Sequence, residues 1–257
     1  MQSRQNDLTT WVVNTITIGT AAVFIGRVLW QISVPNASDI AKKITVRIDG
    51  ANTGSGVIVE HQGDRYVVLS NWHVVNVEDP ALATKSFTIR TGDGHLHFVT
   101  TRKISRVDQL DLAILEFQSR NRYSVASIGD SDRLNEGEIL YVSGWADPSP
   151  QLSTRVYQFL VGNLSGRIAE TVPPFLRNAA RREHQPQDGY ALVYTVNALP
   201  GMSGGPVLDS RGNLVGINGR ATVDLRTGTV TSVLGIDINR YLRTIGKLPS
   251  QKWRKYN

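Results

Sequence analysis

Short runs in which apolar residues alternate with polar ones recur along most of the chain, with turn residues between them. This pattern predicts strands joined by tight turns, because neighbouring residues of a strand face opposite sides of a sheet. Six predicted strands in the first half cover residues 42–49, 53–60, 65–70, 86–91, 96–101 and 112–117. Six in the second half cover residues 139–144, 155–166, 190–196, 204–209, 213–219 and 229–236. We therefore predict an all-β body of two six-stranded antiparallel β-barrels, about residues 42–117 and 138–236.

Two segments depart from this strand pattern. Residues 237–245 predict a short C-terminal helix, because Asp237 can cap the first turn and apolar residues recur on one face. Residues 170–189 contain three prolines and no regular period, which predicts a long surface loop.

The first 37 residues predict a membrane-directed helix that serves as an anchor or a signal segment. Residues 8–26 carry no charge, and Trp11 and Trp30 stand where aromatic residues at a membrane surface are expected. A cleavable signal needs small residues before the cleavage point, whereas the nearest candidate has Pro35 there. An uncleaved anchor through residues 8–30 is therefore favoured over a cleaved signal. Both alternatives predict an extracytoplasmic protein, either membrane-anchored by a single pass or secreted, for example into a periplasm.

Composition and charge exclude several classes of function. The 257 residues include no cysteine, which excludes a disulfide scaffold, a thiolate nucleophile and cysteine-bearing metal sites. The net charge is +6, but residues 1–30 contribute +1 and the tail at 247–257 contributes +4. A nearly neutral body over residues 38–246 is a poor footprint for a nucleic-acid partner, so we expect none.

One candidate for chemistry is a serine in a glycine-rich turn, Ser203 in PGMSGGP. Such a turn can expose the hydroxyl and aim backbone N–H groups at one point, as stabilisation of an oxyanion requires. Gly-x-Ser-x-Gly also describes the nucleophile turn of α/β-hydrolases, in which the histidine follows the serine. No histidine follows Ser203 in this chain. The remaining order is His, Asp, Ser.

Two further segments supply those partners. His73 follows a predicted strand, so rigid backbone can hold it beside a cleft, as suits a general base. Asp111 precedes an apolar strand and can orient the imidazole, with Asp108 as the alternative three residues earlier. His95 and His97 face one side of a predicted strand, but no third ligand stands near them, so we expect no metal.

Five blocks in order, TGSGVIVE, VVLSNWHVV, DLAILEF, GMSGGPV and LVGING, resemble the trypsin-like serine proteases of the chymotrypsin fold. They are most similar to the bacterial Deg/HtrA-type protease domain, here without the PDZ domain that usually follows it. The resemblance spans residues 42–245 and implies chymotrypsin-like barrels. It also implies that Ser203 is the nucleophile, His73 the base and Asp111 its orienter, and that no cofactor is needed.

The resemblance also implies which residues bind the substrate, a polypeptide. The N–H groups of Gly201 and Ser203 would form the oxyanion hole. Ile217, Asn218 and Gly219 would line the specificity pocket, and Asn197 would lie near its floor. The predicted function is a serine endopeptidase acting through an acyl-enzyme. The alternative is a protease-fold module that binds unfolded polypeptide without turnover. The pattern leaves the oligomeric state open.

Overall fold

The computed structural model describes residues 36–76, 86–150, 152–168, 188–223, 226 and 230–247. From Ala37 onward these residues belong to one compact unit. The predicted anchor at residues 8–30, the predicted loop up to residue 187 and the tail beyond residue 247 lie outside the described ranges. Within those ranges, no helix combines the length and the apolar character that crossing a membrane requires.

The first half folds into one antiparallel sheet of seven strands in the order β5-β4-β1-β2-β3-β7-β6. The strands are β1 (Thr45–Asp49), β2 (Thr53–Gln62), β3 (Arg65–Ser70), β4 (Ser86–Arg90), β5 (Leu96–Thr100), β6 (Ile104–Arg106) and β7 (Ala113–Gln118). Six strands were predicted here, and the additional one is β6, which pairs with β7. With only three residues, β6 is too short to display an alternating pattern.

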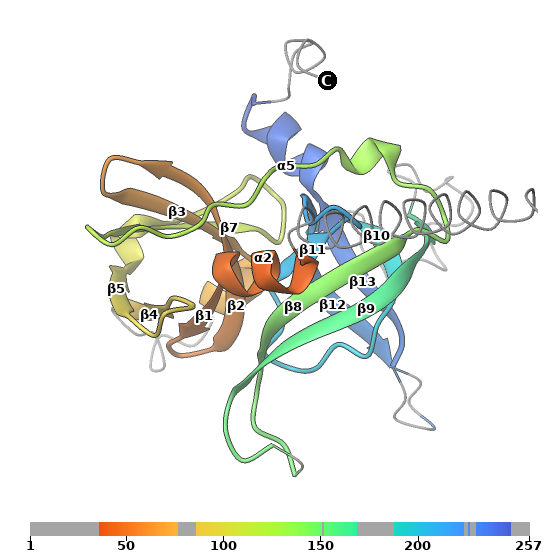
Figure 1. Cartoon of the computed structure of the whole chain (residues 1–257), viewed down its shortest axis with the longest axis horizontal. Coiled ribbons are helices and arrows are strands. Elements are labelled where there is room, and N and C mark those ends of the chain that lie inside the picture. Colours follow the sequence, from red (N-terminus) through yellow and green to blue (C-terminus); the bar gives the residue numbers. More distant parts are fainter. Residues whose placement is uncertain are drawn as a thin grey trace, which may run out of the picture. The chain divides into compact units, whose positions relative to one another are not determined.

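The second half closes into a six-stranded barrel in the order β10-β13-β12-β11-β8-β9. Its strands are β8 (Ile139–Ala146), β9 (Val156–Arg167), β10 (Tyr190–Thr195), β11 (Pro206–Leu208), β12 (Leu214–Val223) and β13 (Val230–Asp237). Each of the six matches a predicted strand, so the sequence pattern is confirmed for this barrel. Figure 1 shows β8 and β9 as a long hairpin that extends to the bottom of the view, with β3, β4 and β5 to the left of α2.

Two helices of seven or eight residues flank the sheets. α5 (Ile238–Thr244) confirms the predicted C-terminal helix, and the Asp237 side chain accepts a hydrogen bond from the Arg240 N–H at 2.9 Å. α2 (Ala37–Ile44) was not predicted, because its last residues were assigned to the first strand. An acidic residue in its first turn and two lysines in its last complement the helix dipole, and its apolar residues face the interior. The first strand therefore begins at Thr45 instead of residue 42.

Three hydrophobic clusters form the interior. The first cluster is formed by buried residues of the seven-stranded sheet and includes Ile58 and Leu115. The second lies inside the closed barrel and includes Val142 and Tyr194. A third cluster joins residues of both halves with α2 and α5. The two sheets are therefore packed against each other through apolar contacts. Residues of a site between the sheets are then fixed in position by the packing of both sheets.

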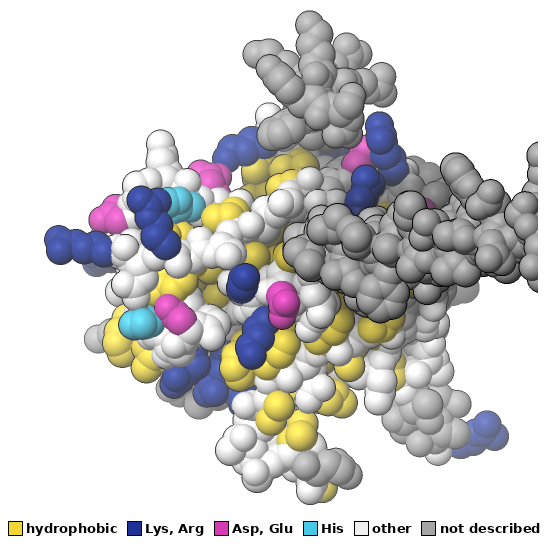
Figure 2. Space-filling model, in the orientation of Figure 1, with side chains coloured by type: hydrophobic (Ala, Val, Ile, Leu, Met, Phe, Trp, Pro, Cys, Tyr) yellow, Lys and Arg dark blue, Asp and Glu magenta, His cyan; other side chains and the backbone are white. Residues whose placement is uncertain are grey.

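Charged side chains of both signs are interspersed on the face shown in Figure 2. Ion pairs in the described fold include Arg65 with Glu116 at 2.6 Å and Arg243 with Asp132 at 3.3 Å. Exposed pairs of this kind contribute little to stability because water screens them. The fold is therefore held mainly by its apolar interior.

Buried tyrosines predict that the fold loses stability in alkali. Burial raises the pKa of Tyr157 and that of Tyr241 to about 12, and it raises the pKa of Tyr194 well above the usual range. A tyrosine in the unfolded chain ionises near pH ~10. Between those values the unfolded chain binds fewer protons, so the stability that is fully present below pH ~10 is lost as the pH rises further.

We expect the free energy of unfolding, measured by urea titration, to fall steadily between about pH 9.5 and pH 11.5. The Tyr241→Phe variant has one fewer group to ionise and should show a shallower fall. An equally steep fall in Tyr241→Phe, or no fall in either protein, would contradict the prediction.

Candidate active site

His73 lies at the end of β3, where the chain turns into the one-turn helix α3 (Trp72–Val75). The strand is buried up to Ser70, and Asn71, with extended backbone, precedes the helix. The His73 side chain is 42% exposed, whereas Val74 and Val75 are buried beside it. A rigid strand end therefore presents an accessible imidazole.

Asp111 meets His73 through two hydrogen bonds. One carboxylate oxygen accepts the His73 backbone N–H at 2.8 Å, and the other lies 2.7 Å from Nδ1 of the ring. The Asp111 carbonyl also accepts hydrogen bonds from the Trp72 N–H at 3.1 Å and from the Asn71 side chain at 3.0 Å. Asp108, the alternative, is exposed in a turn with φ 47°. The structure thus brings Asp111 to the histidine and leaves Asp108 at the surface.

The Asp111 carboxylate is buried and still favoured as an anion. Burial alone would raise its pKa, but hydrogen bonds from His73 and Tyr190 and the charge of the imidazole lower the pKa below the usual value. The Tyr190 hydroxyl donates to Asp111 Oδ2 at 2.6 Å. Burial and the neighbouring Asp111 charge raise the pKa of Tyr190 well above its usual range, so that hydroxyl keeps its proton. An ionised carboxylate that only accepts hydrogen bonds fixes the Nδ1–H tautomer of His73.

Ser203 lies in a turn whose glycines cannot be replaced without distortion. Gly201 has φ 84° and Gly204 has φ 86°, values that favour glycine. A Cβ at Gly204 would lie 2.1 Å from the Ser55 carbonyl oxygen and 2.3 Å from the Ser70 hydroxyl. The Ser55 N–H in turn donates to the Ser203 carbonyl at 2.8 Å. The serine turn therefore packs directly on β2 and on the end of β3, the strand that leads to His73.

The serine turn carries three polar groups of interest, the Ser203 hydroxyl and the backbone N–H groups of Gly201 and Ser203. The Ser203 hydroxyl donates to the Gly219 carbonyl at 2.8 Å and not to His73. Among the described residues, no group accepts a hydrogen bond from the N–H of Gly201 or Ser203. Two backbone donors in one tight turn are the arrangement that binds a developing oxyanion.

The predicted pocket residues differ in where they lie. Ile217 is fully buried, and the Asn218 side chain accepts from the Tyr194 hydroxyl at 2.7 Å and donates to the Met202 carbonyl at 3.0 Å. Asn197 is exposed. Gly219 faces the serine with its carbonyl oxygen. The Asn218 side chain thus supports the serine turn from inside the barrel.

Sequence reasoning missed Tyr190, the second side-chain donor to Asp111. Its hydroxyl occupies the space beside Gly219, where a Cβ would lie 2.3 Å from the Tyr190 oxygen. A glycine within a strand signals close approach by another group, and Gly219 was such a signal. The Arg220 guanidinium lies over the Tyr190 ring at 5.0 Å and pairs with Asp188 at 2.7 Å, so one face of the tyrosine ring is covered by a cation that Asp188 holds in place.

The two histidines considered for a metal make other contacts. His97 Nε2 lies 2.9 Å from the Tyr123 hydroxyl, and the His97 ring stacks on Phe117. His95 Nδ1 lies 2.9 Å from an Asp93 oxygen. No three potential metal ligands come together anywhere in the described part of the chain.

Comparison with known sequences places this geometry in a family. The profile described as "Trypsin-like peptidase domain" matches residues 54–217. The chain is 29% identical over 170 residues to the serine protease Do-like HtrA of Bacillus subtilis (strain 168), covering 65% of this chain and 33% of that protein. It is 28% identical over 165 residues to the periplasmic pH-dependent serine endoprotease DegQ of Escherichia coli (strain K12), covering 64% and 30%. The chain spans about a third of the length of these curated relatives.

Solved structures agree on the fold. An HtrA-type protease with a tripeptide superposes with a TM-score of 0.61 at 18% identity, covering 82% of this chain and 62% of that one. Rv3671c from M. tuberculosis H37Rv gives a TM-score of 0.61 at 16% identity, covering 84% and 91%. Since the family profile also covers more than half of the sequence, this chain belongs to the trypsin-like peptidase domain family, with serine proteases of the Deg/HtrA type among its relatives.

Proposed function

We propose that the chain is a serine endopeptidase that hydrolyses peptide bonds through an acyl-enzyme, with Ser203 as nucleophile, His73 as general base and Asp111 as its orienter. The observation that carries the proposal is the pair of hydrogen bonds, 2.8 and 2.7 Å, between the buried Asp111 carboxylate and the exposed His73. A buried carboxylate hydrogen-bonded to a solvent-accessible imidazole is typical of a general base, whereas a core histidine would itself be buried. Family membership supports the same chemistry.

Each step follows from these residues. His73 Nε2 takes the hydroxyl proton as Ser203 attacks the substrate carbonyl, and Asp111 stabilises the imidazolium. The N–H groups of Gly201 and Ser203 bind the oxyanion. The imidazolium then gives its proton to the leaving amine, and the acyl group stays on Ser203. Water, deprotonated by His73, attacks the ester and releases the acid.

We propose that the substrate is an extended polypeptide that adds as a strand beside β12. The pairing of β11 with β12 ends at Ile217, whereas β13 follows β12 on its other side as far as Val223. The Asn218 N–H and carbonyl still bond to Gly205 and Gly204, so this edge of β12 is open among the described strands only from Gly219 onward, where the Gly219 carbonyl accepts the Ser203 hydroxyl. Strand addition supplies backbone hydrogen bonds without demanding one side chain. Of the candidate specificity residues Asn197, Ile217, Asn218 and Gly219, the side chains of Ile217 and Asn218 are buried, which leaves Asn197 and Gly219 accessible to a substrate.

We also propose that the chain acts outside the cytoplasm. DegQ, a relative at 28% identity, is periplasmic by name. The uncharged N-terminal segment supports export, with a membrane tether through residues 8–30 as the finer proposal.

Denatured casein incubated with the full chain tests the proposed activity. We expect casein fragments that accumulate with time, that a fluorophosphonate suppresses, and that the Ser203→Ala variant does not produce. Binding of casein by both proteins without any fragments would overturn the proposal and leave a binding module in its place.

The Tyr190→Phe variant tests the part played by the second donor to Asp111. The ring still fills the space beside Gly219, but Asp111 loses one of the hydrogen bonds that hold its carboxylate beside His73. We expect kcat to fall about 10- to 150-fold, as for the loss of one hydrogen bond to a charged group, about 1.5–3 kcal/mol.

Tyr66→Phe is the matched control, because Tyr66 is also buried but donates its hydroxyl to the Asn121 carbonyl in the first sheet. Its kcat should match that of the unmodified chain. An equal kcat for the Tyr190→Phe variant and the unmodified chain would show that Tyr190 only packs.

A further inference from the structure

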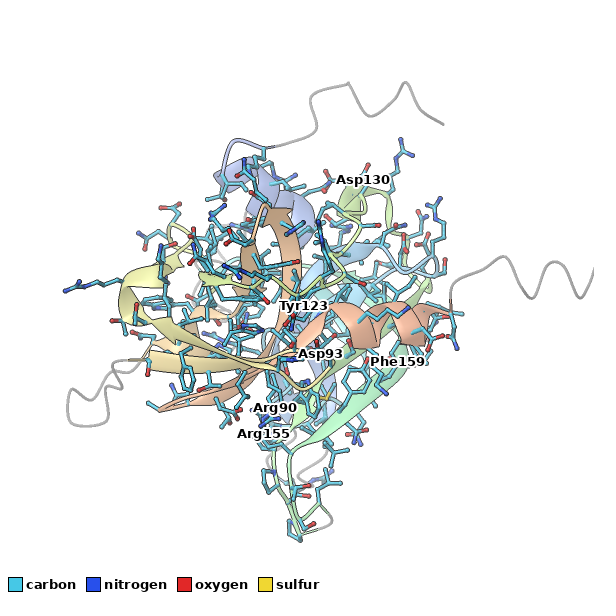
Figure 3. The ribbon with its side chains drawn as sticks, turned by 60° about the vertical axis from the view of Figure 1, so that its left-hand side comes forward. Arg90, Asp93, Tyr123, Asp130, Arg155 and Phe159 are labelled. Atoms are coloured by element: carbon cyan, nitrogen blue, oxygen red, sulfur yellow. The ribbon has the colours of Figure 1, made fainter. Side chains whose placement is uncertain are left out.

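Arg155 is a buried arginine outside the proposed triad. It immediately precedes β9, and its side chain is only 6% exposed (labelled in Figure 3). Nη1 donates to the Ile48 carbonyl at 2.9 Å and to Asp49 Oδ1 at 2.7 Å. Nη2 donates to the carbonyls of Gly54 and Trp145, each at 2.9 Å. One guanidinium thus joins the first sheet, through β1 and β2, to β8 of the closed barrel.

Two acidic residues balance its charge. Asp49 lies on one side, and Asp147 Oδ1 lies 2.9 Å from Arg155 Nε on the other. Thr53 donates to the second Asp147 oxygen at 2.8 Å. Loss of this cation is costly, because Asp49 would keep its ion pair with Arg47 but Asp147 would be left without a cationic partner among the described residues. Arg155 therefore holds Asp147 in one place.

Asp147 in turn holds the turn that carries Ser203. Its backbone N–H donates to the Pro200 carbonyl at 2.8 Å. No peptide bond is cis in the described chain, and in a trans peptide the C=O and the N–H point in opposite directions. Fixing the Pro200 oxygen towards Asp147 therefore aims the Gly201 N–H the opposite way.

The next carbonyl is fixed as well. The Gly201 oxygen accepts from the Ser55 hydroxyl at 2.8 Å and from Arg155 Nη2 at 3.4 Å. A Cβ at Gly201 would lie 2.6 Å from Asp147 Oδ1 and 2.6 Å from the Trp145 carbonyl. Both peptide units that flank Gly201 are therefore held by Arg155 or by the aspartate that Arg155 binds.

We propose that Arg155 is a positioning residue for the oxyanion hole, and that through Asp147 and the Gly201 carbonyl it keeps the Gly201 N–H pointed at the reacting carbonyl. The inference rests on the proposed protease function for its effect on rate. Asp49 anchors the arginine to the first sheet, so the oxyanion hole is correctly formed only while the two sheets are packed together.

The Arg155→Lys variant tests this role. The lysine ammonium keeps the positive charge, but it cannot donate to all the carbonyl and carboxylate oxygens that the planar guanidinium of Arg155 reaches. An oxyanion contact acts mainly in the transition state, so kcat should fall about 10- to 100-fold while KM changes less than about twofold. Inhibition by a peptide aldehyde, whose adduct carries an oxyanion, should weaken by a similar factor. The control is Arg65→Lys, because Arg65 forms an ion pair with Glu116 in the first sheet. This variant should change neither kcat nor the inhibition by the aldehyde.

A second readout needs no activity. Pro200–Gly201 is the one Pro-Gly pair in the sequence, so ¹³C-carbonyl proline with ¹⁵N-glycine labels a single amide. Its signal should move in Arg155→Lys, should move less in Asp147→Asn, and should stay in place in Arg65→Lys. An unmoved signal in Arg155→Lys would overturn the proposal, and so would a moved signal with full kcat. A moved signal in a chain that cleaves nothing would uphold the positioning role and reject the protease function.

Discussion

Replacing Ser203 with alanine is expected to reduce peptide hydrolysis about 10⁶-fold in kcat, because no hydroxyl remains to form the acyl-enzyme. The substitution should slow the chemical step and leave the fold and peptide binding almost unchanged. In the described structure the side chain makes one hydrogen bond, to the Gly219 carbonyl, and the turn is held by its glycines and by the bond from Ser55. The melting temperature and the binding of a product peptide should therefore stay near their original values.

Initial rates on a chromogenic peptide, with circular dichroism melts of the same preparations, check this expectation. Ser165→Ala is a matched control, because Ser165 is an exposed serine on β9. It should keep full activity. A Ser203→Ala variant with more than about 1% of the original rate would mean that another group attacks the substrate.

The Asp111→Asn variant should lose about 10⁴-fold in kcat. An amide at this position carries no charge to stabilise the imidazolium, and its NH₂ group faces donors on both sides, the His73 ring and the Tyr190 hydroxyl. The ring is then favoured in the wrong tautomer, with no free Nε2 lone pair towards the serine. The original carboxylate, whose pKa is held below the usual value, stays ionised throughout the neutral range.

The neighbouring acid provides the control. Asp108→Asn removes the same charge three residues away, at an exposed turn. We expect kcat within about twofold of the original, because Asp108 is exposed and water and salt screen its charge. A large loss in Asp108→Asn together with a small one in Asp111→Asn would reassign the orienting carboxylate.

The closed barrel could be predicted strand by strand because each of its strands is a run of alternating or buried apolar residues bounded by turn residues. β6 and α2 could not. β6 has three residues, and in α2 the residues before Thr45 continue directly into a strand, so a local pattern does not mark the boundary. Helix formation there depends on burial of Ala41 and Ile44 against the sheets, which is tertiary information.

The candidate site likewise contains residues that the sequence predicts and residues that only the folded structure reveals. Short motifs marked His73, Asp111 and Ser203, since each stands in a distinctive local sequence. Tyr190 lies 79 residues from Asp111 and Arg155 lies 106 residues from Asp49, and neither stands in a motif. Their roles arise only from packing, which brings a hydroxyl beside Gly219 and a guanidinium beneath the serine turn. Residues that support a site are less predictable than those that react, because many sequences can supply the same hydrogen bond.

The most direct test of the proposed nucleophile is to treat the native full chain with a fluorophosphonate probe and to map the modified peptide by mass spectrometry. We predict a single adduct, on Ser203, that is absent after heat denaturation and strongly reduced in His73→Ala, since attack on the probe needs the folded turn and the base. No adduct on the native chain, or an adduct on another residue that persists in Ser203→Ala, would contradict the assignment of Ser203 as the catalytic nucleophile.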